Sequence, residues 1–143
     1  MSMVELLVVL VIVSLAYTLI LPSMRNPSQS VSLRAITQNI SSHLAASRSR
    51  SIATGRPLGV TFDISNHLYR LEMDGRSFVL PRELRLAVTS ARSLSREGPG
   101  TARILFYPDG SSSGGNIRLE QNGRAIDLGV EWLTGQVQVV QAP

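Results

Sequence analysis

The chain has 143 residues, of which 43% are hydrophobic and 17% charged, and its formal net charge is +4. This length suits one modest globular domain with a membrane segment. The absence of cysteine excludes disulfides, thiol chemistry and cysteine-based metal sites, and all 14 basic residues are arginine. The positive charge is spread along the chain, so it does not by itself indicate binding to nucleic acid or anionic lipid.

The N-terminal segment, residues 1–21, is apolar and carries a single charged side chain, that of Glu5. Residues 6–21 would form a helix about 24 Å long at 1.5 Å per residue. Residues 1–5 extend this helix toward the ~30 Å of a bilayer core, which places Glu5 near one membrane surface. A buried core helix is one alternative, but a helix that is apolar on every face needs a large protein around it. A signal peptide is another, but no Lys or Arg precedes the apolar stretch.

Glu5 is the first candidate for a functional residue. A carboxylate in hydrocarbon is costly, so it normally has a partner of opposite charge. The cation nearest to it in the sequence is the α-amine of Met1. This amine can belong to the same chain or to an identical neighbour, and both pairings stay open. The pattern predicts a subunit that sits in a membrane and then assembles with others.

A second helix is predicted after the apolar segment. Pro22 and Pro27 should bend or end the first helix between residues 21 and 29, and Gly55 is a good stop signal for the second. Between them, apolar residues recur every three or four positions, which predicts one stripe that packs on the rest of the domain. The alternating Ser and Arg residues 47–51 are interpreted as a solvated face and last turn. The predicted stripe consists of Leu33, Ile36, Ile40, Leu44 and Ile52.

After the second helix, apolar residues alternate with polar ones, which predicts β-strands. Asp74-Gly75 and Asn122-Gly123 are hairpin signals, and residues 90–100 and 108–115 have the composition of loops. The predicted strands are 58–62, 68–73, 77–80, 84–88, 102–107, 117–120, 125–132 and 136–140.

Trp132, the only tryptophan, lies at the end of one of these alternating segments. From Ile126 to Trp132 the even positions are apolar and share one face, while Asp127 and Glu131 lie on the other. We therefore expect Trp132 to be a core residue and not a surface for recognition.

The sequence contains no pattern that points to catalysis or to a metal. Residues 108–115 are rich in Gly and Ser but lack the Gly-Lys-Ser/Thr ending of a phosphate-binding loop. A long hairpin connection is the preferred interpretation. His43 and His67 have no metal-ligand spacing, and no Ser–His–Asp arrangement can be specified. We predict no catalytic, cofactor or metal site, and a protein that is not an enzyme. The aspartates, which are scattered among turns and form no calcium loop, are Asp63, Asp74, Asp109 and Asp127.

Three segments resemble one known family. The first ten residues, MSMVELLVVL, resemble the mature N-terminus of type IV pilins and type II secretion pseudopilins. In that family an aromatic residue or Met comes first, a small residue second and Glu fifth, before an apolar helix. FYPDGSSSGG at 106–115 and VEWLTG at 130–135 resemble the H-type minor pseudopilins, the GspH and FimT-like group. The resemblance implies that Glu5 and a processed, N-methylated Met1 are assembly residues.

The predicted elements and the resemblance together imply an α+β, pilin-like fold. A long N-terminal helix, with its first half inserted in the membrane, would pack on an antiparallel β domain of two small sheets. Residues 1–28 would be the transmembrane and assembly segment, and residues 29–143 a periplasmic domain. Within that domain we expect a helix at 29–54 and the β domain at 56–141.

The function that the resemblance implies is structural. The chain would be a minor pseudopilin in a short periplasmic pseudopilus that supports protein export across the outer membrane. Before assembly it would lie in the bacterial inner membrane as a single-pass protein, with its β domain in the periplasm. The implied partners are other major and minor pseudopilins, inner-membrane lipid and the inner-membrane assembly platform, with no cofactor.

An alternative function comes from a different class. FimT-like minor pilins share this domain type, and some of them bind DNA during natural transformation. A patch of arginines would supply the phosphate contacts that such binding needs. We favour the interpretation that these are solvated arginines in a chain that contains no lysine. The candidates are Arg82, Arg85, Arg92, Arg96 and Arg103.

Overall fold

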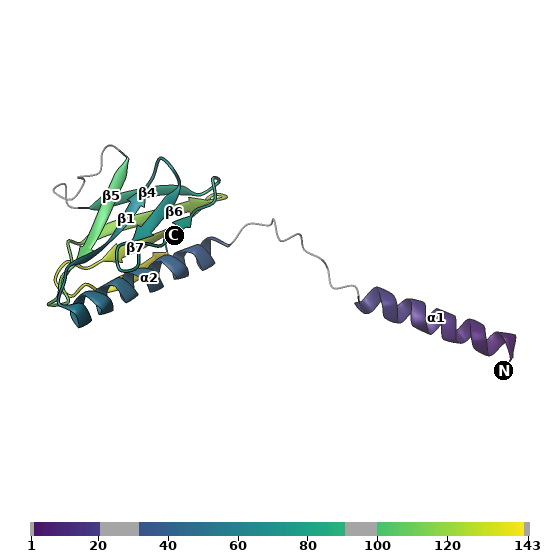
Figure 1. Cartoon of the computed structure of the whole chain (residues 1–143). Helices are drawn as coiled ribbons and strands as arrows, with labels where there is room; N and C mark the ends of the chain where they lie inside the picture. The colour runs from purple at the N-terminus through teal and green to yellow at the C-terminus, as the bar shows by residue number, and fades with distance from the viewer. Residues whose placement is uncertain (1, 21–31, 91–99, 142–143) are drawn as a thin grey trace. The chain divides into compact units, whose positions relative to one another are not determined.

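The computed structural model describes residues 2–20, 32–90 and 100–141. The chain divides into two compact units, Met1–Ser30 and Val31–Pro143, which Figure 1 shows. The described part of the first unit is one helix, and that of the second is a helix with two sheets. The bend predicted between residues 21 and 29 lies outside the described residues.

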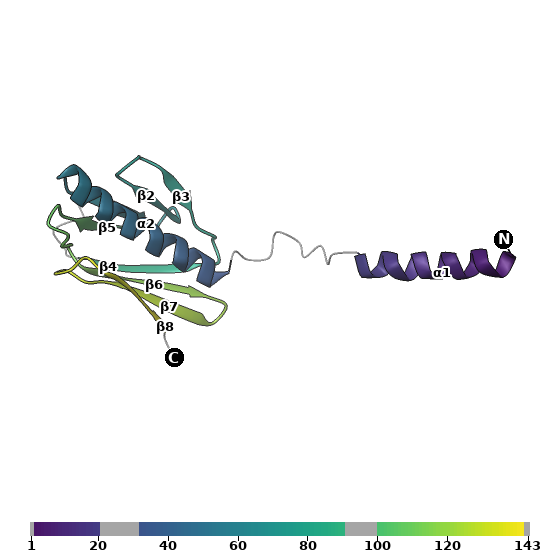
Figure 2. The same cartoon turned by 90° about the horizontal axis from the view of Figure 1, so that it is seen from below.

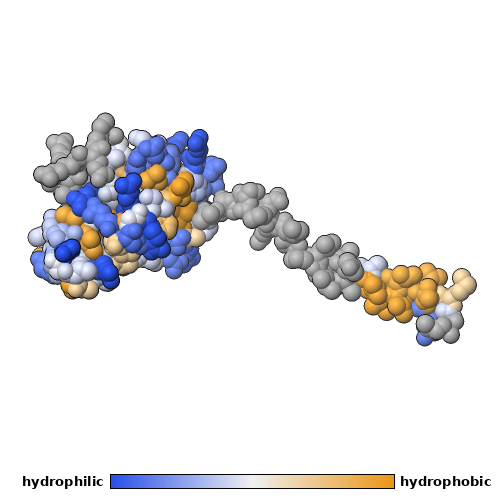
Figure 3. Space-filling model, viewed as in Figure 1, coloured by the Kyte–Doolittle hydropathy of each residue, from blue (hydrophilic) through white to orange (hydrophobic). Residues whose placement is uncertain are grey.

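Helix α1, Met3–Ile20, belongs to the first unit. Ser2 caps this helix, because its hydroxyl accepts a hydrogen bond from the N–H of Val4 at 3.2 Å and its carbonyl accepts one from Glu5 at 3.0 Å. The side chains of residues 2–15 are exposed, and the face seen in Figure 3 is mostly apolar. Within the described residues, no helix combines the length and the hydropathy required of a membrane span.

Helix α2, Leu33–Thr54, begins the second unit. Its N-cap is Ser32, whose hydroxyl accepts from the N–H of Ala35 at 3.3 Å, and it ends at Gly55. The predicted stripe is confirmed at Ile36, Ile40 and Leu44, which are buried, and Leu33 is partly buried.

The stripe prediction is wrong at the C-terminal end of α2. Ile52 is 46% exposed, whereas Ser47 and Ser51 are fully buried instead of solvated. A period of 3.6 residues carries the buried face from Leu44 to positions 47 and 51, and position 52 lies about 100° further round the helix.

The described part of the second unit contains two antiparallel sheets, with strand orders β3-β2-β1-β5 and β4-β6-β7-β8. Figures 1 and 2 show these strands with α2 beside them. The eight predicted strands are confirmed to within two residues at each end. Their bounds are β1 Leu58–Asp63, β2 Leu68–Leu71, β3 Ser77–Val79, β4 Arg85–Ser90, β5 Thr101–Phe106, β6 Gly115–Gln121, β7 Arg124–Val130 and β8 Val137–Gln141.

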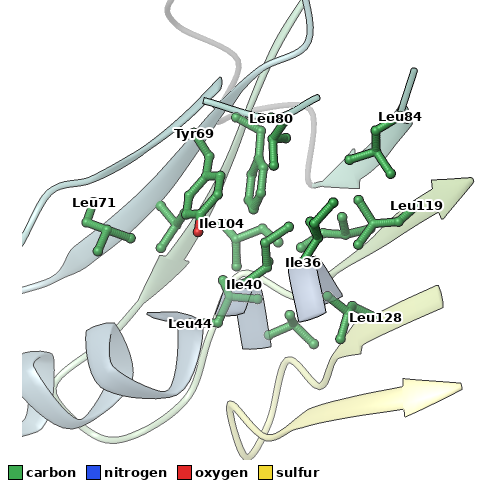
Figure 4. Close-up of a cluster of buried hydrophobic side chains, with 14 of the residues drawn as sticks. Ile36, Ile40, Leu44, Tyr69, Leu71, Leu80, Leu84, Ile104, Leu119 and Leu128 are labelled. Carbon is green, nitrogen blue, oxygen red and sulfur yellow. The ribbon is translucent and has the colours of Figure 1, made fainter. Parts of the chain in front are cut away.

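The core lies between α2 and the inner faces of both sheets, as Figure 4 shows. Ile36, Ile40 and Leu44 project from α2 into side chains of both sheets. The strand residues of this cluster include Tyr69, Leu71, Ile104, Ile117, Leu119 and Leu128. The predicted α+β fold, with a helix packed on two antiparallel sheets, is therefore confirmed.

Trp132 is not in this core, so its predicted burial is wrong. Strand β7 ends at Val130, and the side chain of Trp132 is 63% exposed. The N–H of Gly135 donates to the carbonyl of Glu131 at 2.9 Å, while the N–H of Glu131 donates to the carbonyl of Gln136 at 2.9 Å. With a φ of 66° at Gly135, this is a glycine bulge at the end of a turn. Because Trp132 lies in this turn and not in β7, its side chain does not follow the alternation that places the even positions of the strand in the core.

Candidate functional site

Glu5 lies in the first turn of α1, three residues after its cap. Ser2-Met3-Val4-Glu5 therefore matches the Ser-x-x-Glu capping sequence, and a carboxylate in the first turn also interacts favourably with the helix dipole. This role of Glu5 in capping α1 was not predicted from the sequence, although the spacing of Ser2 and Glu5 indicates it. The side chain of Glu5 is exposed, and Met1 lies outside the described residues.

The histidines and aspartates do not gather into a site. In the parts of the chain that the structure describes, no group of three or more His, Cys, Asp or Glu residues could hold a metal. His67 lies in the turn between β1 and β2 with a φ of 51°. Asp63, Asp74 and Asp109 stabilise their own turns, since each accepts hydrogen bonds from residues two or three positions later. Asp127 instead pairs with Arg118 across β6 and β7, at 3.3 Å.

His43 packs on the core from the partly buried side of α2. Its Nδ1 lies 2.8 Å from the hydroxyl of Tyr69, and its ring lies 4.4 Å from that of Phe78. Burial lowers the pKa of His43, with a further contribution from the positive charge of Arg76. Burial also raises the pKa of Tyr69 to about 12, so the phenol keeps its proton at neutral pH. The pair is a structural contact between α2 and β2.

In the glycine- and serine-rich segment after β5, the amides from Gly110 to Gly114 are not free to cradle a phosphate. Each N–H from Gly110 to Gly114 donates a hydrogen bond within the protein. Ser112 binds the turn after β7 twice, because its N–H donates to the carbonyl of Trp132 at 2.8 Å and its hydroxyl donates to that of Glu131 at 2.9 Å. The two C-terminal segments that resemble the H-type family therefore contact each other in the fold.

Of the five arginines considered for DNA binding, three lie in the described residues. Arg103, on β5, is held by Glu72 through two hydrogen bonds of 2.6 Å. Glu72 also accepts from the N–H of Gly59 at 3.0 Å, which fixes this ion pair to β1. Arg85 lies opposite Glu120 in the pairing of β4 with β6. Arg82 is exposed, and Arg92 and Arg96 lie outside the described residues.

Comparisons with known proteins agree with one another. A family model described as Type II transport protein GspH matches residues 37–134. The Type II secretion system protein H of Xanthomonas campestris pv. campestris is 30% identical over 138 residues, which cover 96% of this chain and 80% of that protein.

Two solved structures share the fold. The minor pseudopilin EpsH from the Type 2 Secretion System of Vibrio cholerae matches with a TM-score of 0.59 and 12% identity, over 76% of this chain and 96% of that chain. The type IV minor pilin FimU of Pseudomonas aeruginosa matches with a TM-score of 0.56 and 14% identity, over 78% of this chain and 88% of that chain. At these identities, the two matches are evidence for the fold alone.

Proposed function

This chain belongs to the GspH family, the minor pseudopilins of the type II secretion system, and we propose that it is a structural subunit that supports protein export. The observation that carries the proposal is the family match at 37–134, which spans α2 almost entirely and every strand except β8. The pilin-like arrangement of one helix on two antiparallel sheets is consistent with it. DNA binding is not favoured, because the matching family model and the 30% identical relative are both described as type II transport or secretion proteins.

The proposed role is mechanical and not catalytic. Pseudopilins are structural proteins, and Asp63, Asp74 and Asp109 of this chain form hydrogen bonds within their own turns. The two segments that resemble the family, 106–115 and 130–135, bind each other through Ser112. This contact holds the end of the β domain together. The backbone N–H groups from Gly110 to Gly114 are already hydrogen-bonded, so they do not offer a set of donors to a substrate.

We propose that Glu5 and Met1 are the assembly residues. In this proposal the processed and N-methylated α-amine of Met1 pairs with Glu5 of a neighbouring subunit. An ion pair in a low dielectric is strong only when both groups are well paired, and removing one partner leaves a costly buried charge. The exposed, apolar side chains of α1 supply the surface that would face lipid before assembly and neighbouring helices afterwards.

The location and partners follow from this role. We propose that α1 anchors the chain in the bacterial inner membrane as a single span, with the β domain in the periplasm. The helix is 18 residues long, about 27 Å at 1.5 Å per residue, which approaches the thickness of a bilayer core. The proposed partners are the other major and minor pseudopilins and the inner-membrane assembly platform.

Deletion and complementation in the source bacterium tests the function. Deletion of the gene that encodes this chain should abolish the release of secreted proteins into the medium. Expression of the full chain at native level should restore that release. Natural transformation should be unchanged, since the proposed role is in protein secretion. Normal secretion accompanied by a loss of transformation would contradict the proposal and favour the DNA-binding alternative.

A further inference from the structure

The two sheets have four edge strands, and three of them are protected. Strands β4 and β5 contact each other where the sheets meet. The edge of β5 is also closed by Ser113, whose N–H donates to the carbonyl of Leu105 at 2.8 Å. Strand β3 has three residues and is followed by Leu80 and Pro81. Short strands, proline and coverage are the usual ways in which proteins prevent strand addition.

Among the strands and loops that the structure describes, β8 is the edge that nothing protects. Figure 2 shows it at the border of its sheet, with β7 beside it on one side and no strand on the other. Residues 136–141 contain no charge and no proline. Because Glu131 donates to Gln136, the alternation of an antiparallel ladder directs the backbone of Gln138 and Val140 toward β7. The backbone of Val137, Val139 and Gln141 then points outward, and no described residue forms a hydrogen bond with it.

A groove runs between this edge and α2. A hollow of about 420 Å³ lies beside Val139 and Ile126, and a second of about 290 Å³ lies beside Val137. Ser41 lines both hollows, so they are neighbours along α2. The apolar part of the groove is accessible, because Val139 is 51% exposed.

The charge of the groove is positive at both ends. Arg34 lines the hollow beside Val139 and Arg48 lines the hollow beside Val137, and no acidic residue lines either one. These arginines are 14 positions apart on one helix, which is about 21 Å at 1.5 Å per residue. An extended segment of seven residues spans about the same length at 3.3 Å per residue.

We infer that the β8 edge binds an extended, acidic segment of a different protein chain, which adds to the sheet as a further strand. Main-chain hydrogen bonds to Val137, Val139 and Gln141 would supply affinity, as in other strand additions. An apolar side chain would cover Val139, and a carboxylate would lie beside Arg34. A second copy of this chain fits less well, because antiparallel pairing of β8 with itself places Arg34 of one copy near Arg48 of the other.

The test is amide exchange measured by NMR on the full chain in detergent micelles. The probe is the capped peptide Glu-Thr-Val-Thr-Val-Thr-Glu, which presents two valines and two terminal carboxylates on one face. At saturation, exchange at Val137, Val139 and Gln141 should slow by about tenfold, since these amides gain a hydrogen bond. Exchange at Gln138 and Val140, which already bind β7, should change little.

Four controls make the result specific. Val139→Pro removes one outward N–H, which an edge strand tolerates, and should prevent the protection, whereas Val139→Thr should keep it. The same peptide with terminal lysines should bind about fivefold more weakly or worse, and Arg34→Glu should reverse that preference. Equal effects of both peptides, no protection by either, or protection that rises with protein concentration alone would overturn the inference. None of these outcomes bears on secretion by the deletion strain, so the proposed function is tested separately.

Discussion

Two buried serines on one face of α2 differ in their hydrogen bonding. Ser47 and Ser51 are both fully buried. The hydroxyl of Ser51 lies 2.7 Å from the carbonyl oxygen of Arg56 and 3.0 Å from that of Phe106, so it joins the end of α2 to β5. The hydroxyl of Ser47 has no partner among the described residues.

This difference predicts opposite effects of the same substitution. Ser51→Ala should lower the free energy of unfolding by about 1–3 kcal/mol, because it leaves buried acceptors without a donor. Ser47→Ala should be neutral or stabilising, because it removes a polar group that is buried without a hydrogen bond. Urea unfolding of the two variants measures both values, and equal destabilisation would contradict the assignment.

Trp132 should contribute little to stability, because its side chain is exposed in the turn. Trp132→Ala should change the free energy of unfolding by no more than about 0.5 kcal/mol, as expected of a surface position. Phe106→Ala is the matched comparison, since Phe106 is fully buried and its truncation should cost about 3–5 kcal/mol. Thermal melting compares the two. A large loss of stability in the Trp132→Ala variant would contradict this prediction and indicate that Trp132 is a core residue.

His43 should make stability depend on pH. Its pKa lies below the usual 6.5 in the folded protein, mainly because of burial, so the unfolded chain binds more protons. The stabilisation from neutral His43 is therefore complete above about pH 6.5 and is lost as the pH falls toward the lower, folded pKa. His43→Gln should remove this part of the pH dependence. An unchanged pH profile of the melting temperature in that variant would contradict the prediction.

The burial of an individual residue in α2 was predictable where two conditions were met: the side chain is apolar, and the helical period places its position on the buried face. Ile36, Ile40 and Leu44 satisfy both conditions. Ser47 and Ser51 satisfy only the period, so a pattern based on hydrophobicity passed over them and selected Ile52. Arg103 was counted as a free cation because its partner, Glu72, is 31 positions away in the sequence.

At the scale of elements, the alternation of apolar and polar residues and the turn residues between them predicted the strands. Which sheet each strand joins depends on contacts between residues that are distant in the sequence. Strand β5, for example, pairs with β1 and not with the strand before it. The end of β7 was placed too late because the apolar alternation continues through Trp132, whereas Gly135 and its hydrogen bonds set the turn. The contact of this turn with Ser112 has no local signal in the sequence.

Two glycines with the same sign of φ should respond differently to alanine. Gly135 and Gly123 have φ values of 66° and 73°. A Cβ at Gly135 would collide with the carbonyl oxygen of Gly110, whereas one at Gly123 would meet no atom within 4 Å. Gly123→Ala should cost only the backbone term of about 1–2 kcal/mol, and Gly135→Ala should cost more. Equal losses in denaturant unfolding would show that the packing of the turn on Gly110 is unimportant.

At the scale of the whole molecule, the resemblance of MSMVELLVVL predicted the superfamily, and the two C-terminal segments predicted the H type. The family match at 37–134 confirms that assignment from residues outside the N-terminal motif. What the sequence could not provide is the arrangement of the open β8 edge, since edge exposure depends on the order of all strands in both sheets.

The central claim is tested most directly by isolating pseudopili from two strains. One strain carries the parent chain and the other the Glu5→Gln variant, and the amount of the chain recovered in the pseudopili is compared. Glutamine can replace glutamate in the capping sequence, so the variant keeps the start of α1 while losing the negative charge. Ser2→Ala is the complementary control, because it removes the capping hydroxyl and retains the charge. We predict that the parent and Ser2→Ala chains are recovered in the pseudopilus and that Glu5→Gln is not. Recovery of Glu5→Gln at the parent level, with normal secretion, would contradict the account.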